Sequence, residues 1–165
     1  MTVVGLMGSG KSTIGKLLAS RLSLSFVDLD EMIVQAQGKS IPQIFEQDGE
    51  AVFRALESQA LEEALKFQDS VIATGGGVIL SEHNRERMKD AGQVIWLDAS
   101  PKTLAARITG DSNRPLLHDV DPLEKMIALT SERNPLYEQV ADLKIDTSIL
   151  SDKEAVDKIA AFLSE

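Results

Sequence analysis

The stretch GLMGSGKS, residues 5–12, decides the fold of this 165-residue chain. It fits the phosphate-binding pattern G-x-x-x-x-G-K-[ST], and it lies between the apolar run TVVGL at 2–6 and an amphipathic stretch that begins at Lys11. Glycines let backbone N–H groups converge on phosphate oxygens, and a helix beginning near Lys11 adds the positive end of its dipole. The pattern therefore predicts a phosphate-binding loop between a buried strand and a helix. A chance glycine-rich turn is the alternative.

The residues of this loop can be assigned to parts of a nucleotide. Lys11 can reach the β- and γ-phosphates, and the Ser12 hydroxyl is a hard oxygen ligand for Mg²⁺. A phosphate loop alone does not separate kinases, GTPases, motor ATPases and inactive relatives. The sequence has no N-K-x-D-like motif of guanine-specific GTPases, and TGGG at 74–77 stands where a Walker B strand would end in aspartate. The loop residues expected to contact ATP are Gly8, Ser9, Gly10, Lys11, Ser12 and Thr13.

Apolar runs alternate with amphipathic segments along the rest of the chain. This pattern predicts a three-layer α/β/α fold of the phosphate-loop NTPase type, in which helices cover both faces of a five-stranded parallel sheet. We expect a single domain over residues 1–165, because no linker, repeat or low-complexity tract interrupts the pattern. The strands are expected at residues 2–6, 25–30, 70–73, 94–97 and 143–146.

The composition restricts the classes of partner. Acidic residues outnumber basic ones by 26 to 17, which gives a formal net charge of −9. Such a chain repels polyanions, so nucleic acid is not expected as a partner. The chain has no cysteine, which excludes disulfides, zinc–thiolate sites and redox thiols. No apolar run reaches the roughly 18 residues of a membrane span, and no signal peptide is recognisable, so a cytoplasmic protein without a membrane partner is expected.

Two carboxylates end the second expected strand, in DLD at 28–30. Alternation along a strand would turn Asp28 and Asp30 to the same side, at the sheet edge where α/β proteins bind ligands. One carboxylate could then hold Mg²⁺ or its water while the other binds an acceptor hydroxyl. An ordinary helix N-cap pair is the alternative, since a helical stretch follows Asp30.

These motifs, in this order, resemble those of the shikimate kinases, within the nucleoside-monophosphate-kinase-like group of phosphate-loop proteins. The resemblance covers nearly the whole chain, and its most specific part lies at 40–57, because other small-molecule kinases do not usually share it. It implies Mg²⁺-dependent phosphoryl transfer from ATP to the 3-hydroxyl of shikimate, a step of chorismate and aromatic amino-acid biosynthesis. The motifs are GLMGSGKST at 5–13, DLD at 28–30, SIPQIFEQDGEAVFRALE at 40–57, TGGG at 74–77, RPLL at 114–117 and ERNPLY at 132–137.

The resemblance also implies roles for the two aspartates. Asp30 would bind two neighbouring hydroxyls of shikimate and orient or deprotonate the attacking one. Asp28 would hold Mg²⁺ through water, beside Ser12. The segment at about 30–60 would then be the main substrate-binding part of the chain.

A carboxylate-binding group is implied in the same way. Arg54 and Arg133 would bind the shikimate carboxylate, and Glu57 would orient Arg54 from one helical turn away. The chemistry agrees with this, because a planar guanidinium matches a carboxylate bidentately, and residues three apart share a helix face. The residues expected against the rest of the substrate are Gly75, Gly76 and Gly77 along the ring, with Phe45 and Phe53 as an apolar wall.

The polar segment at 109–119 is expected to form a mobile lid over ATP. Arg114 in this segment would reach the transferring phosphoryl group, and so it joins Lys11 and Asp30 as an expected catalytic residue. Arg107 would flank the adenine. The chain departs from the family pattern after the last expected strand, where Leu150 stands at a position that is often arginine or another polar residue.

Other interpretations remain open from the sequence. A related kinase acting on gluconate or a nucleoside monophosphate would share the phosphate loop, and a non-catalytic ATP-binding module would need no phosphoryl-transfer residues. We expect a monomer that binds ATP and shikimate. Trp96 is expected in the core, and Tyr137, close after Pro135, is expected to end a helix.

Overall fold

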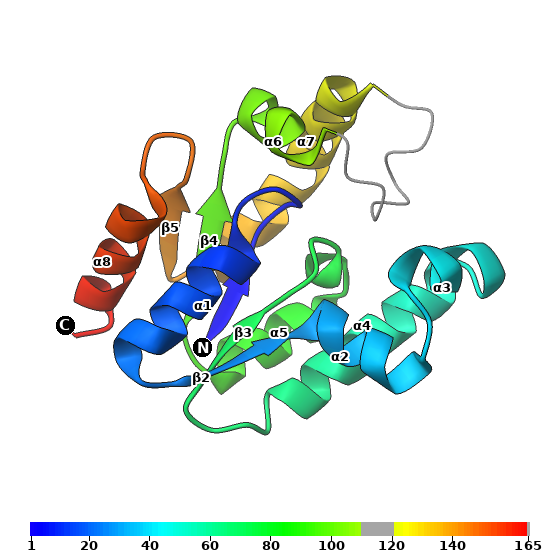
Figure 1. The fold of residues 1–165 in the computed structure, drawn as a ribbon, viewed down its shortest axis with the longest axis horizontal. Helices are drawn as coiled ribbons and strands as arrows, with labels where there is room; N and C mark the ends of the chain where they lie inside the picture. Colours follow the sequence, from blue (N-terminus) through cyan, green and yellow to red (C-terminus); the bar gives the residue numbers. More distant parts are fainter. Residues whose placement is uncertain (110–120, 165) are drawn as a thin grey trace.

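One five-stranded parallel sheet organises the structure, a computed structural model that describes residues 1–109 and 121–164 (Figure 1). The strands lie in the order β2-β3-β1-β4-β5, so β1 occupies the centre. Thr2 of β1 pairs with Ile72 of β3 on one side and with Val94 of β4 on the other. The strands are β1 (Thr2–Val4), β2 (Ser25–Asp28), β3 (Ser70–Ala73), β4 (Val94–Asp98) and β5 (Leu143–Asp146). All five expected strands are therefore present.

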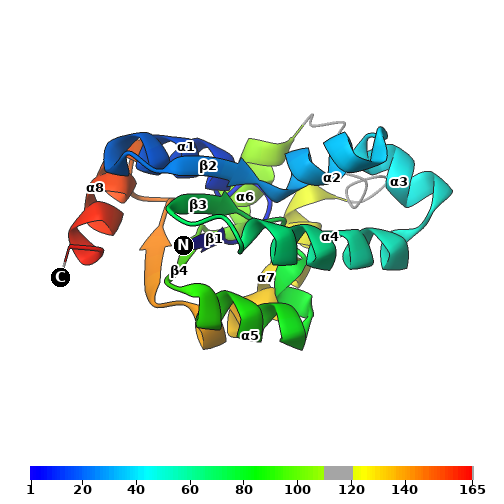
Figure 2. The same ribbon diagram turned by 90° about the horizontal axis from the view of Figure 1, so that it is seen from below.

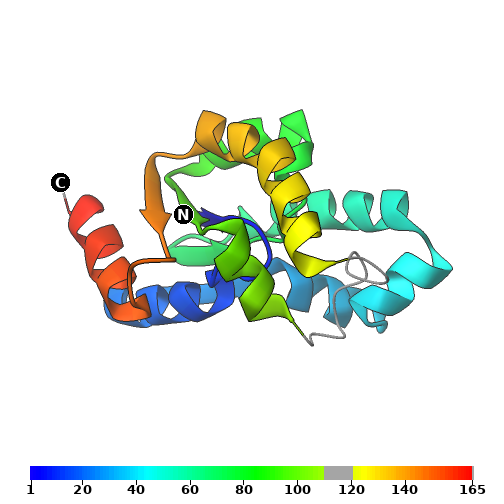
Figure 3. The same ribbon diagram turned by 90° about the horizontal axis from the view of Figure 1, so that it is seen from above.

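Helices cover both faces of the sheet, as the sequence predicts. Val3 faces a core shared with α1 and α8, whereas Val4 faces the core of the opposite side, which is the alternation expected of a strand. Figure 2 shows α1 and α5 on opposite sides of the sheet, and Figure 3 shows α8 and α3 at opposite ends of the molecule. The helices are α1 (Lys11–Leu22), α2 (Leu29–Gln37), α3 (Ile41–Gln47), α4 (Glu50–Ala64), the 3₁₀ helix η1 (Val78–Leu80), α5 (Glu82–Ala91), α6 (Pro101–Ile108), α7 (Pro122–Val140) and α8 (Asp152–Phe162).

Polar caps begin several helices where the sequence predicts them. The Ser40 side chain accepts a hydrogen bond from the backbone N–H of Gln43, and the Gln43 side chain accepts one from the backbone N–H of Ser40. Ser100 caps α6, and Ser151 caps α8. These side chains satisfy N–H groups that have no partner within the helix, which fixes where each helix begins.

The second strand is shorter than the sequence predicts. β2 ends at Asp28, and α2 begins at Leu29 with no loop residue between them. The Asp28 carboxylate accepts a hydrogen bond of 3.0 Å from the backbone N–H of Asp30 and so caps α2. The prediction that strand alternation orients Asp30 is therefore wrong, because this residue lies in the first turn of a helix.

The predicted helix end at Tyr137 is also wrong. α7 continues through Pro135 to Val140. Proline lacks the N–H of an intrahelical hydrogen bond, which favours a helix end. Tyr137, however, is fully buried and stacks on Trp96 with the ring centroids 5.7 Å apart. Burial of this face therefore outweighs the proline, and Trp96 lies in the core as predicted.

The topology creates a crevice at the carboxyl end of β1. Strands β2 and β3 lie to one side of β1 within the sheet, and the chain then crosses to β4 and β5 on the other side of β1. Open α/β sheets bind ligands where the strand order reverses in this way. The loop after β1 therefore lies where a ligand site is expected.

The predicted lid at 109–119 lies outside the described residues, except for Thr109. Arg114 is the predicted site residue in that segment. Within the described parts of the chain, no helix is long and apolar enough to cross a membrane.

Candidate active site

The loop after β1 curls around the amino terminus of α1. Gly8 and Gly10 have φ angles of +80° and +93°, a conformation that other residues rarely adopt. The N–H of Ser9 donates to the Leu6 carbonyl at 3.2 Å, and the N–H of Ile14 donates to the Gly10 carbonyl at 2.8 Å. The loop therefore has the tight shape that directs N–H groups toward a phosphate at a helix amino terminus.

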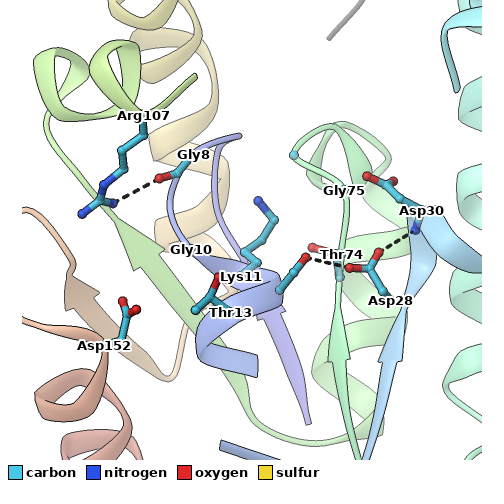
Figure 4. A pocket seen from close by; sticks show the side chains of 12 residues that line it. Gly8, Gly10, Lys11, Thr13, Asp28, Asp30, Thr74, Gly75, Arg107 and Asp152 are labelled. Carbon is cyan, nitrogen blue, oxygen red and sulfur yellow. Dashed lines mark hydrogen bonds between the residues drawn. The ribbon is translucent and has the colours of Figure 1, made fainter. Parts of the chain in front are cut away.

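A pocket of about 530 Å³ lies over this loop, at the carboxyl edge of the sheet. Figure 4 shows Arg107 and Asp152 on one side of the loop and Asp28 and Asp30 on the other. The predicted ATP-binding residues of the loop line this pocket, except for Ser9, which is buried. The lining residues are Gly8, Gly10, Lys11, Ser12, Thr13, Asp28, Asp30, Thr74, Gly75, Gly76, Arg107 and Asp152.

Ser12 and Asp28, the two residues predicted to hold Mg²⁺, lie side by side. The Ser12 hydroxyl donates to a carboxylate oxygen of Asp28 at 2.7 Å, which places two oxygen atoms side by side in the pocket wall. Mg²⁺ prefers such hard oxygen ligands and completes its shell with water and phosphate oxygens. The donor set therefore fits Mg²⁺. Lys11, beside them, donates from its ammonium group to the Leu6 carbonyl at 2.9 Å.

A partly buried ion pair lies on α4, beside the pocket. Arg54 donates to Glu57 at 2.8 Å and to Glu50 at 3.1 Å. The Glu57 residue is only 1% exposed. Burial raises the pKa of Glu57, the Arg54 guanidinium opposes that shift, Asp30 adds to it and Arg133 opposes it. Because these charges act on one carboxylate, Asp30, Arg54 and Arg133 all lie near Glu57.

The glycine turn after β3 joins this pair to the pocket. A Cβ atom at Gly77 would overlap the Arg54 guanidinium, and one at Gly75 would overlap the Glu57 carboxylate and lie 3.3 Å from Asp30 Oδ1. The turn is therefore glycine-rich for a reason beyond backbone freedom, since side chains there would displace the charged groups. Gly75 and Asp30 both line the pocket and contact the Arg54–Glu57 side of the site.

An aromatic pair lies next to Arg54. The Phe45 and Phe53 ring centroids are 4.7 Å apart, and the Arg54 guanidinium carbon lies 5.4 Å from the Phe53 centroid. Phe53 is buried and Phe45 is packed against the same core. The structure thus brings both predicted phenylalanines together with the predicted carboxylate-binding arginine.

Arg133 reaches the same region from α7, and it is only 4% exposed. Tyr137, one turn further along α7, donates from its hydroxyl to the Gly76 carbonyl at 2.6 Å. Tyr137 was predicted only as the end of a helix. Its spacing of four residues from Arg133, which predicts a shared helix face, is the signal that could have identified it.

Arg107 is more constrained than the sequence suggests. Its guanidinium donates to the Gly8 carbonyl at 3.1 Å, to the Thr147 hydroxyl at 3.0 Å and to the Thr147 carbonyl at 2.6 Å. Arg107 thus ties the phosphate loop to the segment after β5. Asp152, which reaches the pocket from that segment, was predicted only as part of a helix, and Leu150 packs against the core next to α1 and α8.

Comparisons with known proteins agree on one family. The family model described as shikimate kinase matches residues 7–164. The chain is 45% identical to a shikimate kinase of Xanthomonas euvesicatoria, over 99% of this chain and 91% of that relative. It is 42% identical to one of Symbiobacterium thermophilum, over 100% of this chain and 96% of the other. A solved structure of shikimate kinase from Acinetobacter baumannii in complex with shikimate matches with a TM-score of 0.96 and 38% identity, covering 99% of this chain and 91% of that one.

Proposed function

The chain belongs to the shikimate kinase family, whose reaction is the ATP-dependent phosphorylation of shikimate, and we propose which of its residues carry out that reaction. The observation that carries the proposal is the position of Asp30. This carboxylate lines the pocket over the phosphate loop and also lies beside Gly75 and Glu57. A group in that position can contact both the acceptor and the phosphoryl donor.

The phosphate loop binds the ATP phosphates. The first N–H groups of α1 and the Lys11 ammonium carry positive charge to the β- and γ-phosphates, and Lys11 exchanges its Leu6 partner for a phosphate oxygen. Ser12 would hold Mg²⁺ directly and Asp28 would hold it through water; the ion, when bound, would neutralise charge on the phosphate oxygens. Catalysis in this half of the site is therefore mainly positioning and charge neutralisation.

Asp30 binds the acceptor. Its carboxylate accepts a hydrogen bond from the 3-hydroxyl of shikimate and directs that oxygen at the γ-phosphorus. The new P–O bond forms as the bond to the leaving ADP oxygen breaks, and the hydroxyl proton passes to the Asp30 carboxylate. The backbone that carries this side chain is held at the start of α2, because the Asp30 N–H donates to Asp28.

The opposite end of shikimate carries a carboxylate, which Arg54 and Arg133 bind. Two cations suit a small carboxylic acid, and each guanidinium offers a planar pair of donors. Glu57 holds Arg54 in place through the 2.8 Å hydrogen bond. The residues that line the substrate ring are Gly75, Gly76 and Gly77 on one side and Phe45 and Phe53 on the other.

The remaining roles follow from the resemblance of the motifs. Arg107 flanks the adenine, and its three hydrogen bonds to the loop and to Thr147 hold the guanidinium plane in the pocket wall. Arg114 contacts the transferring phosphoryl group. The protein acts as a monomer in the cytoplasm.

A coupled assay of ADP release tests this proposal. Shikimate, gluconate, AMP and CMP are supplied separately as acceptors with MgATP, and the Lys11→Ala variant, purified in parallel, controls for contaminating kinases. We expect ADP release from the wild type with shikimate alone, and its loss in Lys11→Ala. Release with another acceptor only would favour a related kinase, and no release with any acceptor would favour a non-catalytic ATP-binding module. Either result would overturn the proposal.

A further inference from the structure

Tyr137 is buried behind the glycine turn and takes no part in the roles described so far. Its side chain is fully inaccessible, and its hydroxyl donates to the Gly76 carbonyl at 2.6 Å across 61 residues of sequence. Burial raises the pKa of the Tyr137 hydroxyl, so this group keeps its proton and remains a donor at neutral pH. The contact therefore links α7 to the turn after β3 at neutral pH.

The orientation of Tyr137 is fixed from the other side by β4. Its ring stacks on Trp96 at a centroid distance of 5.7 Å and an interplanar angle of 25°. Trp96 is itself 3% exposed and pairs with Val4 of the central strand. The Tyr137 hydroxyl is thus held by a rigid part of the sheet rather than by a loop.

Tyr137 also lies beside Arg133, one turn earlier on α7. The Arg133 guanidinium acts on the Tyr137 hydroxyl and opposes the effect of burial on its pKa. One hydroxyl therefore lies near the guanidinium of Arg133 and bonds directly to the turn that contains Gly76.

We propose that Tyr137 is a positioning residue for the acceptor, which fixes the glycine turn and Arg133 relative to each other so that they meet shikimate as one preformed surface. This inference rests on the proposed function, in which Arg133 binds the shikimate carboxylate and Gly76 lies along the ring. A purely structural role for Tyr137 is the competing explanation, since any buried tyrosine contributes to the core.

The Tyr137→Phe variant separates the two explanations. It keeps the ring on Trp96 and removes only the hydroxyl. We expect the KM for shikimate to rise about two- to twelvefold, the effect of losing one hydrogen bond between neutral groups, while the KM for ATP changes by less than about twofold. We also expect the variant to lose part of its preference for shikimate over shikimate methyl ester, because Arg133 is then less well placed.

Ile159→Val is the matched control. Ile159 is fully buried in the core on the other face of the sheet, so this variant is destabilised at a distance from the acceptor. It should show normal KM values for both substrates. If Tyr137→Phe leaves the shikimate KM unchanged, or raises the KM for shikimate and ATP equally, Tyr137 is structural and the inference is wrong. A wild type that does not phosphorylate shikimate would instead refute the proposed function.

A second measurement uses the unaltered chain, which contains one tyrosine. Biosynthetic incorporation of 3-fluorotyrosine therefore labels Tyr137 alone. We expect its ¹⁹F resonance to shift on saturation with shikimate and to shift less with the methyl ester. A resonance that does not respond to saturating shikimate would overturn the inference even if Tyr137→Phe failed to fold.

Discussion

Gly77→Ala offers a test of how the acceptor site holds its arginine. Gly77 has φ −94° and ψ −6°, a conformation that alanine adopts without strain. The obstacle is the Arg54 guanidinium, three atoms of which lie closer to the new Cβ than any real contact allows. Because the guanidinium is the far end of a flexible side chain, we expect it to move and the backbone to stay.

The cost can be estimated from the bonds that Arg54 makes. Moving the guanidinium breaks its 2.8 Å hydrogen bond to Glu57 and takes it away from its predicted place on the shikimate carboxylate. A hydrogen bond to a charged group contributes about 1.5–3 kcal/mol, so the KM for shikimate should rise by about tenfold to about 150-fold. The KM for ATP should change little, because Gly77 does not line the pocket over the phosphate loop.

The Arg54→Ala background supplies the control for this variant. The three atoms nearest to a Cβ at Gly77 all belong to Arg54, so Gly77→Ala should raise the shikimate KM little further where Arg54 is already absent. Steady-state kinetics of Gly77→Ala are therefore compared in the wild-type and Arg54→Ala backgrounds. An unchanged shikimate KM for Gly77→Ala in the wild-type background would refute the reasoning. So would a full additional loss from Gly77→Ala where Arg54 is already absent.

Three further predictions test other parts of the site. Asp30→Asn should lower kcat by about 10²- to 10⁴-fold with ATP binding retained, whereas Asp28→Asn should be partly rescued by high Mg²⁺; identical magnesium titrations would contradict these separate roles. The pKa of Glu57 in the folded state lies above its ordinary value of 4.5, so protonation of this carboxyl favours the folded state. The stability that comes from this shift is present below pH 4.5 and is lost as pH rises through the folded-state pKa. Relative to the wild type, Glu57→Gln should therefore gain free energy of unfolding as pH rises above 4.5, measured by urea denaturation, and a constant difference would exclude this. Arg107→Ala should lower the free energy of unfolding by about 1–2 kcal/mol and raise the KM for ATP, because its link to Thr147 is lost; unchanged ATP kinetics would show that Arg107 is not part of the nucleotide site.

The local parts of the site could be predicted from the sequence. The phosphate loop, the five strands and the helix caps depend on residues within a few positions of one another, and their patterns survive in the structure. The junction at Asp28 was less predictable, because two local preferences compete there. The strand pattern continues to Asp30, but an aspartate that precedes a helical pattern also favours an N-cap. In the structure Asp28 forms the N-cap, so the strand ends there.

Contacts between distant residues could not be predicted in the same way. Tyr137 bonds to Gly76 across 61 residues, and the Thr147 hydroxyl lies 3.3 Å from the Ser9 carbonyl across 138. Such bonds can be predicted only when the order of the strands is known. The sequence pattern predicts a parallel sheet but not the order of its strands. The same holds for Asp152, whose approach to the pocket depends on the place of β5 beside β4.

The direct junction of β2 and α2 limits how this chain can change in length. An α-helix turns by about 100° per residue, so inserting one residue between Asp28 and Asp30 would rotate the start of α2 by that amount and carry the Asp30 carboxylate away from Gly75. A deletion would rotate it the other way. The exposed segment 66–69 lies between α4 and β3, at the amino ends of the strands. It has no such constraint and can take extra residues. Among functional relatives, insertions and deletions should therefore occur in the segment that corresponds to 66–69 and be absent from the β2–α2 junction.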